Sequence, residues 1–209
     1  MPKNGSATKD RILDAAERLV IDNGYAGTSV DAVIAASGTS KGAFFHHFAS
    51  KLELAEALVT RYAASDIAHL HDALATVRAQ SDDPVRQLVD FVRVFEQTAD
   101  ELMAAQSSCL YVSILTEREL VLDGTARQIA DAVTAWRDEL SALIRRALDA
   151  TPNGRRRDID PDALADHMFV TFEGAFILCR STQQREHMRA QLRVLRQLLQ
   201  ALLADDEPH

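Results

Sequence analysis

The chain has 209 residues, of which 47% are hydrophobic and 26% charged, a composition typical of a globular protein and not of a disordered one. Its net charge of −8 argues against binding to nucleic acid unless positive charge is gathered locally. The N-terminus is polar, and no apolar run approaches the ~20 residues of a membrane span. These features predict a cytoplasmic protein that has no membrane partner.

Only helices are predicted along the chain, and an all-α fold is therefore expected. Residues 8–23 place apolar side chains on one face of a first helix. A second helix begins near Thr28, which with Asp31 resembles a capping box, and stops at Gly38. Ser40 begins a third helix two residues later. A helix, a Gly-containing turn of about three to four residues and a second helix form the helix-turn-helix pattern, whose second helix enters the major groove of DNA.

A long helix follows this three-helix head. Ser50 and Glu53 form a second capping signature, and neither Gly nor Pro occurs between them and residue 78. We therefore expect one rigid helix over residues 50–78 that leaves the head and enters the rest of the chain. The predicted domains are a helix-turn-helix DNA-binding domain over 1–51, extending into this helix, and a second domain over 52–209.

The second domain is expected to be an antiparallel helical bundle. Its helices are bounded by Asp, Pro and Gly at positions where helices begin or end. The basic triplet at residues 155–157 could contact phosphate, but Asp158 and Asp160 follow it, and we interpret it as a solvated connector. The expected helices span 84–102, 109–119 and 126–147, then one from Pro161 to beyond Cys179, and a last one over 184–204.

Charge is weakly asymmetric along the chain. Residues 1–51 contain six Lys and Arg against five Asp and Glu, a net charge of +1, which leaves −9 for the other 158 residues. Affinity for DNA rises with the number of phosphates that a protein neutralises. The small positive excess therefore predicts few phosphate contacts per subunit and the need for two subunits on one DNA site.

Two overlapping segments carry a resemblance to a known family. They are ILDAAERLVIDNGYAGTSV, from Ile12, and SVDAVIAASGTSKGAFFHHFASKLEL, from Ser29. Together they resemble the N-terminal DNA-binding segment of the TetR family of bacterial transcriptional regulators. Thr39 departs from the family, which usually has an apolar residue there, and so does Phe45, where Tyr is usual. The resemblance implies a dimeric regulator in which the long helix links a ligand pocket to the DNA-binding head.

The residues that contact DNA can be proposed individually. Thr28 and Ser29 stand near a helix N-terminus, where hydroxyl and N–H groups bind phosphate oxygens. Lys41 can donate to guanine O6 and N7, and Ala43 can contact a thymine methyl group. The resemblance implies DNA-backbone contacts at Phe45, His47 and Lys51, although Phe45 lacks a hydroxyl group. The full predicted set is Thr28, Ser29, Thr39, Ser40, Lys41, Gly42, Ala43, Phe45, His46, His47 and Lys51, with Phe44 and Phe48 expected in the core.

The last two helices carry more apolar surface than one bundle needs. We expect this excess to form a four-helix homodimer interface with twofold symmetry. Such a dimer places two recognition helices about one DNA turn, or a multiple of it, apart on a palindrome. The alternative is that these side chains only close the core of one chain. The predicted interface residues are Gly174, Ala175, Leu178, Leu192, Leu195 and Leu199.

The domain over 52–209 is interpreted as a ligand-binding and dimerisation domain. A small, largely apolar molecule that binds among its helices and shifts helix 50–78 would release the DNA, provided that it prefers one arrangement of the heads. The expected function is thus a ligand-responsive regulator, most simply a repressor. Each lining residue could instead be ordinary core. The predicted lining residues are Phe91, Phe95, Tyr111, Trp136, His167, Phe169 and Phe172.

Two alternatives remain. Cys109 lies near the start of a short helix, where the helix dipole favours the thiolate, so that a redox or electrophile sensor is one alternative to a small buried cysteine. The other is a helical-bundle enzyme. It is not expected, because the sequence contains no phosphate-binding Gly-rich loop, nucleophile elbow or repeated Glu-x-x-His set. We predict neither a cofactor nor a metal, and two cysteines, Cys109 and Cys179, are too few for a disulfide framework.

Overall fold

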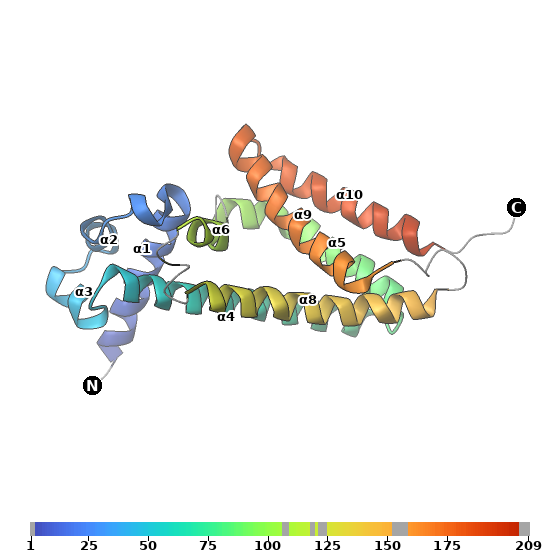
Figure 1. Ribbon diagram of the computed structural model, residues 1–209, viewed down its shortest axis with the longest axis horizontal. Coiled ribbons are helices and arrows are strands. Elements are labelled where there is room, and N and C mark those ends of the chain that lie inside the picture. Colours follow the sequence, from blue (N-terminus) through green and yellow to red (C-terminus); the bar gives the residue numbers. More distant parts are fainter. Residues whose placement is uncertain (1–2, 106–108, 118–119, 121–124, 152–158, 205–209) are drawn as a thin grey trace, which may run out of the picture. The chain divides into compact units, whose positions relative to one another are not determined.

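The structure is a computed structural model (Figure 1), and within the residues that it describes every regular element is a helix. The predicted all-α fold class is confirmed. None of the helices in these residues combines the length and the apolarity that crossing a membrane requires. The described residues are 3–105, 109–117, 120, 125–151 and 159–204.

Nine labelled helices follow one another in these residues, and their bounds lie close to the predicted ones. The largest difference is in the first helix, predicted over 8–23, which begins five residues earlier and ends four residues later. The short helix predicted over 109–119 ends four residues earlier. The break at 152–154, the basic triplet at 155–157 and the Asp123-Gly124 turn lie outside the described residues. The helices are α1 (Lys3–Gly27), α2 (Val30–Ser37), α3 (Lys41–His47), α4 (Lys51–Gln80), α5 (Pro84–Ala105), α6 (Leu110–Leu115), α8 (Thr125–Ala150), α9 (Pro161–Thr182) and α10 (Glu186–Leu203).

The chain divides into two compact units. The head unit comprises Met1–Ser65 and Gln106–Asp131, and the body unit comprises Asp66–Ala105 and Ala132–His209. Helices α4 and α8 each contain residues of both units. The boundary predicted at residue 51 was placed between a DNA-binding domain and a regulatory domain. The compact units instead divide the chain after residues 65, 105 and 131.

In the head unit, α1 packs against α2, α3 and α6. The predicted end of the first helix near residue 23 corresponds to a kink, because Gly24 adopts a φ of 76°, a left-handed value that glycine tolerates. Phe44 and Phe48 of the recognition segment are buried, as predicted, and their rings lie 5.8 Å apart. Ile12 of α1 and Leu58 of α4 are also buried in the head unit.

A capping box holds the start of α4. The Ser50 hydroxyl accepts a hydrogen bond from the Glu53 N–H at 3.1 Å, and the Glu53 carboxylate accepts one from the Ala49 N–H at 2.6 Å. Two backbone N–H groups at the helix start are thereby satisfied. The long helix predicted over 50–78 is confirmed, since α4 runs without interruption from Lys51 to Gln80.

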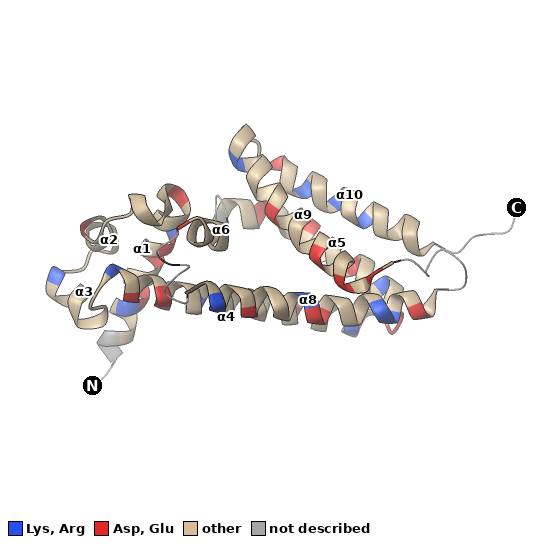
Figure 2. Cartoon of the chain, viewed as in Figure 1, with Lys and Arg blue, Asp and Glu red and all other residues tan. Residues whose placement is uncertain are grey.

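In the body unit, α10 packs against both α5 and α9. Three arginines of α10, spaced so that they share one helix face, form ion pairs with two acids of α5. Figure 2 shows the basic residues of α10 in blue. The pairs are Arg189 with Asp100 at 2.6 Å, Arg193 with Glu96 at 3.0 Å and Arg196 with Glu96 at 2.7 Å.

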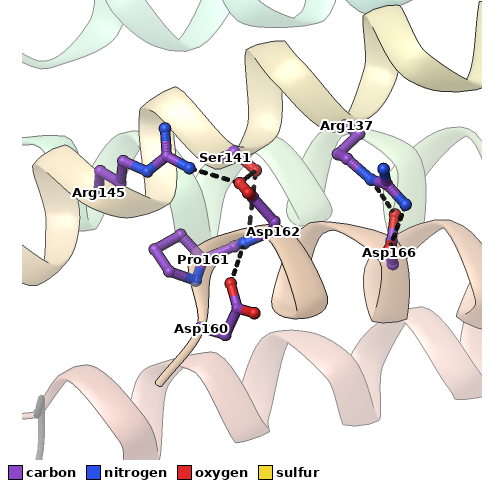
Figure 3. Close-up of polar contacts among 7 residues, drawn as sticks. All are labelled: Arg137, Ser141, Arg145, Asp160, Pro161, Asp162 and Asp166. Atoms are coloured by element: carbon purple, nitrogen blue, oxygen red, sulfur yellow. Dashed lines mark hydrogen bonds and ion pairs between the residues drawn. The ribbon is translucent and has the colours of Figure 1, made fainter. Parts of the chain in front are cut away.

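A second polar seam joins α8 to α9 (Figure 3). Arg137 donates two hydrogen bonds to the Asp166 carboxylate, both at 2.6 Å, in the bidentate geometry that suits a guanidinium group. Ser141 and Arg145 both donate to Asp162 Oδ1, in the first turn of α9. The Asp160 side chain accepts from the Asp162 N–H, which confirms the start of this helix predicted at Asp160-Pro161.

Candidate nucleic-acid interface and sensor body

Local hydrogen bonds set the two short helices of the candidate DNA-binding segment. Ser29 caps α2 by accepting from the Ala32 N–H, and Ser40 caps α3 by accepting from the Ala43 N–H, both at 3.1 Å. Between them, Gly38 ends α2 with a φ of 62°. The predicted helix, turn and helix are therefore present at the predicted positions.

One predicted phosphate contact needs correction. Thr28 is only 3% exposed, and its hydroxyl donates to the Gly24 carbonyl at 2.8 Å. The Thr28 side chain therefore stabilises the kink of α1 within the head unit, and its hydroxyl is not exposed for a contact with DNA. The cap of α2 is Ser29, one residue later than the capping box in the sequence suggests, and Ser29 is exposed.

The other predicted DNA-contacting residues differ in how they face solvent. Ser40, Lys41, Gly42 and His46 are exposed, and Phe45 is 46% exposed. Four more are half-buried: Thr39, Ala43, His47 and Lys51.

Two half-buried residues of this set have defined partners. The Thr39 hydroxyl lies 2.8 Å from that of Ser37, which explains how a polar residue fits where an apolar one is usual. The Lys51 ammonium group lies 4.0 Å from the centroid of the Tyr25 ring, a cation–π contact that holds a positive charge at the start of α4. Tyr25 was not among the predicted site residues, because no pattern in the sequence indicates which ring a lysine will cover.

Four of the seven residues predicted to line a ligand pocket form one ring cluster in the body unit. The ring cluster consists of Phe91 and Phe95 from α5, Trp136 from α8 and Phe172 from α9. The ring centroids of its contacting pairs lie 5.1 to 6.4 Å apart, within the range of favourable edge and tilted contacts. The Trp136 indole N–H also donates to Asp66 Oδ2 at 3.0 Å.

The other three predicted lining residues are not part of the ring cluster. Tyr111 belongs to the head unit, where its ring packs edge-on against Tyr62 at 5.0 Å. His167 is exposed and Phe169 is half-buried on α9. Helical spacing placed all of these aromatic residues on apolar faces, but it contains no information about which faces meet.

The predicted dimer interface also needs correction. Leu192, Leu195 and Leu199 of α10 and Ala175 of α9 are buried within a single chain. A second chain cannot reach these side chains without unpacking the body unit. Of the predicted set, Leu178 is exposed and Gly174 is half-exposed.

Other large apolar side chains take the exposed positions on these two helices. On α9, Val170, Ile177 and Leu178 recur at the spacing of one helix face, and on α10 Val194 and Leu198 do the same. We call these five residues the apolar surface set. The excess apolar surface that the sequence indicated is therefore present, but of the predicted residues only Leu178 contributes to it, and the other four members of the set were not predicted.

The buried state of Cys109 bears on the redox alternative. Cys109 precedes α6, is 3% exposed, and accepts a contact from the Tyr62 hydroxyl at 3.9 Å. A reactive cysteine must be accessible to its oxidant as well as ionised. Burial favours the other interpretation, a small apolar residue in the core of the head unit.

Two segments of the chain match known protein families. Residues 12–58 match the family described as "Bacterial regulatory proteins, tetR family". Residues 84–195 match the "Tetracyclin repressor-like, C-terminal domain", and this match alone covers more than half of the chain. The chain belongs to the TetR family. It is a DNA-binding transcriptional regulator.

Individual TetR-family relatives are similar over most of their length. The chain is 25% identical over 200 residues to the HTH-type transcriptional repressor DhaR of Mycobacterium sp. (strain GP1), covering 95% of this chain and 94% of that protein. It is 26% identical over 182 residues to the transcriptional regulator AcuR of Cereibacter sphaeroides, covering 83% and 77%. A TetR-family regulator from Agrobacterium tumefaciens shares the fold, with a TM-score of 0.75, 22% identity and coverage of 96% and 100%.

Membership of the TetR family decides between a DNA-binding regulator and a helical-bundle enzyme. The match over residues 12–58 contains α2, α3 and the start of α4, so the candidate DNA-binding segment lies wholly inside it. The relatives named above are transcriptional regulators, and the helical-bundle enzyme is therefore set aside.

Proposed function

We propose that this TetR-family chain is a repressor that binds a palindromic operator in the cytoplasm as a homodimer and leaves it when a small apolar molecule binds. The observation that carries the proposal is the first turn of α3. Lys41 and Gly42 are exposed there, while Ser40 caps the helix and Phe44 anchors it in the core. A short helix held in this way can present Lys41 to base edges in the major groove.

The apolar surface set supports the dimer. An exposed row of apolar side chains on each of two adjacent helices is unusual for a monomer and typical of a surface that a partner covers. A twofold pairing of α9 and α10 with their copies would bury both rows in a four-helix arrangement. The dimer also compensates for the low positive charge of a single head, because two heads double the number of phosphates neutralised.

The ring cluster supports an apolar effector. Its four aromatic side chains come from three helices, α5, α8 and α9, so a molecule that separates the rings would change how these helices pack. Such a molecule regulates DNA binding only if it binds one arrangement better than the other. DhaR, one of the similar proteins, is named as a repressor, which agrees with repression as the proposed activity of this chain.

In vitro selection of DNA bound by the full chain tests this function. We expect the selected sequences to be palindromic, with half-sites about one DNA turn (~34–36 Å) or a multiple apart. Sedimentation of the free protein should give a dimer. The selected DNA is then used in a screen for small apolar molecules that release it from the protein. Random selected sequences, or a monomer at micromolar concentration, would contradict the proposal.

A further inference from the structure

Lys9 of α1 lies beside the C-terminal end of α3, the predicted recognition helix. Its ammonium group is 5.7 Å from the centroid of the Phe48 ring. Phe48 is the buried cap residue of α3, and its ring lies 6.4 Å from that of His47. A lysine within about 6 Å of a ring centroid is attracted to the ring face. Phe48 therefore holds the positive charge of Lys9 next to the last turn of α3.

The charge of Lys9 is available to a partner. Lys9 is exposed, and no Asp or Glu among the residues that the structure describes forms an ion pair with it. The next three acids along α1 have other partners: Asp10 accepts from Ser6 at 3.3 Å, and Asp14 and Glu17 accept from Arg61 at 2.6 and 2.7 Å.

The position of Lys9 suits a DNA phosphate better than a base edge. A recognition helix reaches base edges with its N-terminal residues, which in α3 include Lys41. The seven residues of α3 rise about 10 Å, and the major groove is about 12 Å wide. With Lys41 inside the groove, the other end of α3 lies close to the sugar–phosphate backbone at the groove wall. Lys9 adds a cation at that end.

We infer that Lys9 binds a DNA phosphate and extends the DNA interface from α2 and α3 onto α1. The residues predicted from the sequence to contact DNA include two lysines, Lys41 and Lys51, and Lys9 is a third in each subunit. Phosphate contacts position a protein on DNA and carry no sequence information. Lys9 therefore contributes to affinity and not to selectivity. This inference rests on the proposed function and adds a residue to its DNA interface.

The dependence of DNA affinity on salt tests this role. Each phosphate that a protein neutralises contributes about −0.9 to the slope of log K against log salt concentration. Lys9→Met keeps an unbranched side chain against Phe48 and removes the charge, whereas Lys9→Arg keeps the charge. Arg146→Met removes an exposed cation from α8 as the control. Anisotropy titrations with the selected operator and with a random duplex of equal length are made between about 50 and 200 mM salt.

A dimer of Lys9→Met lacks two phosphate contacts, so the magnitude of its slope should be smaller by about 1.8 than that of the wild type. The same increase in salt should then weaken its binding about tenfold less. Its affinity should fall by the same factor on operator and random DNA. Lys9→Arg and Arg146→Met should keep the wild-type slope. Lys9→Gln has the same expectation as Lys9→Met and replaces it if Lys9→Met loses its helical circular dichroism signal.

Three results would overturn the Lys9 contact: a wild-type slope in the uncharged variant, a loss of affinity confined to the operator, or a failure of Lys9→Arg to restore the slope. In each of them the wild-type protein still binds its operator, so the proposed function survives. A decrease near 0.9 on the operator would support the contact and contradict the proposed dimer. If selection yields no specific operator, the proposed function fails, and the random duplex still decides whether Lys9 binds phosphate.

Discussion

The α2–α3 segment and the α9–α10 pair show opposite relations between sequence and structure. In α2–α3 the chemistry is local: Ser29, Gly38 and Ser40 each act on groups within four residues, and the helices begin and end beside them. In α9–α10 the apolar rows are wide, and their orientation depends on partners far away in the chain. The comparison teaches that capping residues fix where a helix lies in the sequence, whereas long-range contacts decide which face turns outward.

The contacts of α10 give the physical reason. Its arginines pair with Glu96 and Asp100 of α5, which turns that side of α10 towards α5. The leucine row at Leu192, Leu195 and Leu199 faces the core as a result, and Val194 and Leu198 face solvent. The apolar stripe of α10 is wide enough to supply both a buried face and an exposed apolar face. The sequence alone therefore does not show which of its residues the same chain covers.

The largest expected difference between two substitutions concerns two adjacent aromatic residues of α3, Phe44 and Phe45, and their effect on the free energy of unfolding. Phe44 is completely buried, and Phe44→Ala should lower the free energy of unfolding by about 3–5 kcal/mol, because it removes a ring from a packed core. Phe45→Ala, at a position that is 46% exposed, should change it by about 0.5 kcal/mol or less. Urea unfolding followed by circular dichroism measures both. Equal losses would mean that α3 is rotated from the orientation described.

A matched pair on α10 tests the other half of the comparison. Leu192 is completely buried, and Leu192→Ala should cost about 2–5 kcal/mol of unfolding free energy. Leu198 is 58% exposed, so Leu198→Ala should leave the fold intact and weaken dimer association instead. Unfolding curves and sedimentation at matched protein concentrations separate the two effects. If the Leu192→Ala dimer dissociates while its unfolding free energy is unchanged, the dimer interface predicted from the sequence would be supported instead.

The fold class, the helix-turn-helix and the long α4 were predictable because caps, Gly and helical periodicity act within a few residues. The ring cluster was predictable in part, since Phe91, Phe95, Trp136 and Phe172 were all assigned to one predicted pocket lining and their rings lie together. That they line a ligand pocket stays a prediction. Asp66 was missed, although a buried indole N–H signals that some acceptor must be near. The pairing of Trp136 with Asp66 joins residues 70 positions apart, and no local pattern indicates such a partner.

The ion pairs that orient α10 should make stability depend on pH. Burial alone would raise the pKa of Glu96, but hydrogen bonds and attraction from Arg196 and Arg193 outweigh it and lower the pKa below its ordinary 4.5. A group with a lowered folded-state pKa stabilises the fold above its unfolded-state pKa, and this stabilisation disappears as the pH falls through the folded value.

Glu96→Gln should therefore cost about 1.5–3 kcal/mol at neutral pH, the range for hydrogen bonds to charged groups, and less in acid. Urea unfolding of both proteins at a series of pH values measures the difference. The matched control is Asp131→Asn, which changes an exposed acid of α8. A difference between wild type and Glu96→Gln that stays constant down to strongly acidic pH would show that the carboxylate charge is unimportant.

The smallest effect concerns the departure at position 45. Phe45→Tyr adds a hydroxyl group to an exposed ring of α3 without changing its packing against Phe44. If the α3 surface meets the DNA backbone, one added hydrogen bond should tighten binding by about 1 kcal/mol, with unchanged unfolding free energy. Anisotropy titrations with the selected DNA measure this gain. Weaker binding would place the ring against bases or sugar instead.

The most direct test of the account is the contribution of Lys41 to recognition of the selected operator. Lys41→Ala removes the exposed cation from the first turn of α3, and Arg146→Ala removes one from an exposed position of α8 as a control for net charge. Titrations with operator and with random DNA should show that Lys41→Ala loses about 1–3 kcal/mol on the operator and discriminates less, while Arg146→Ala behaves as wild type. Unchanged affinity and selectivity in Lys41→Ala would show that a different face of the head meets the DNA.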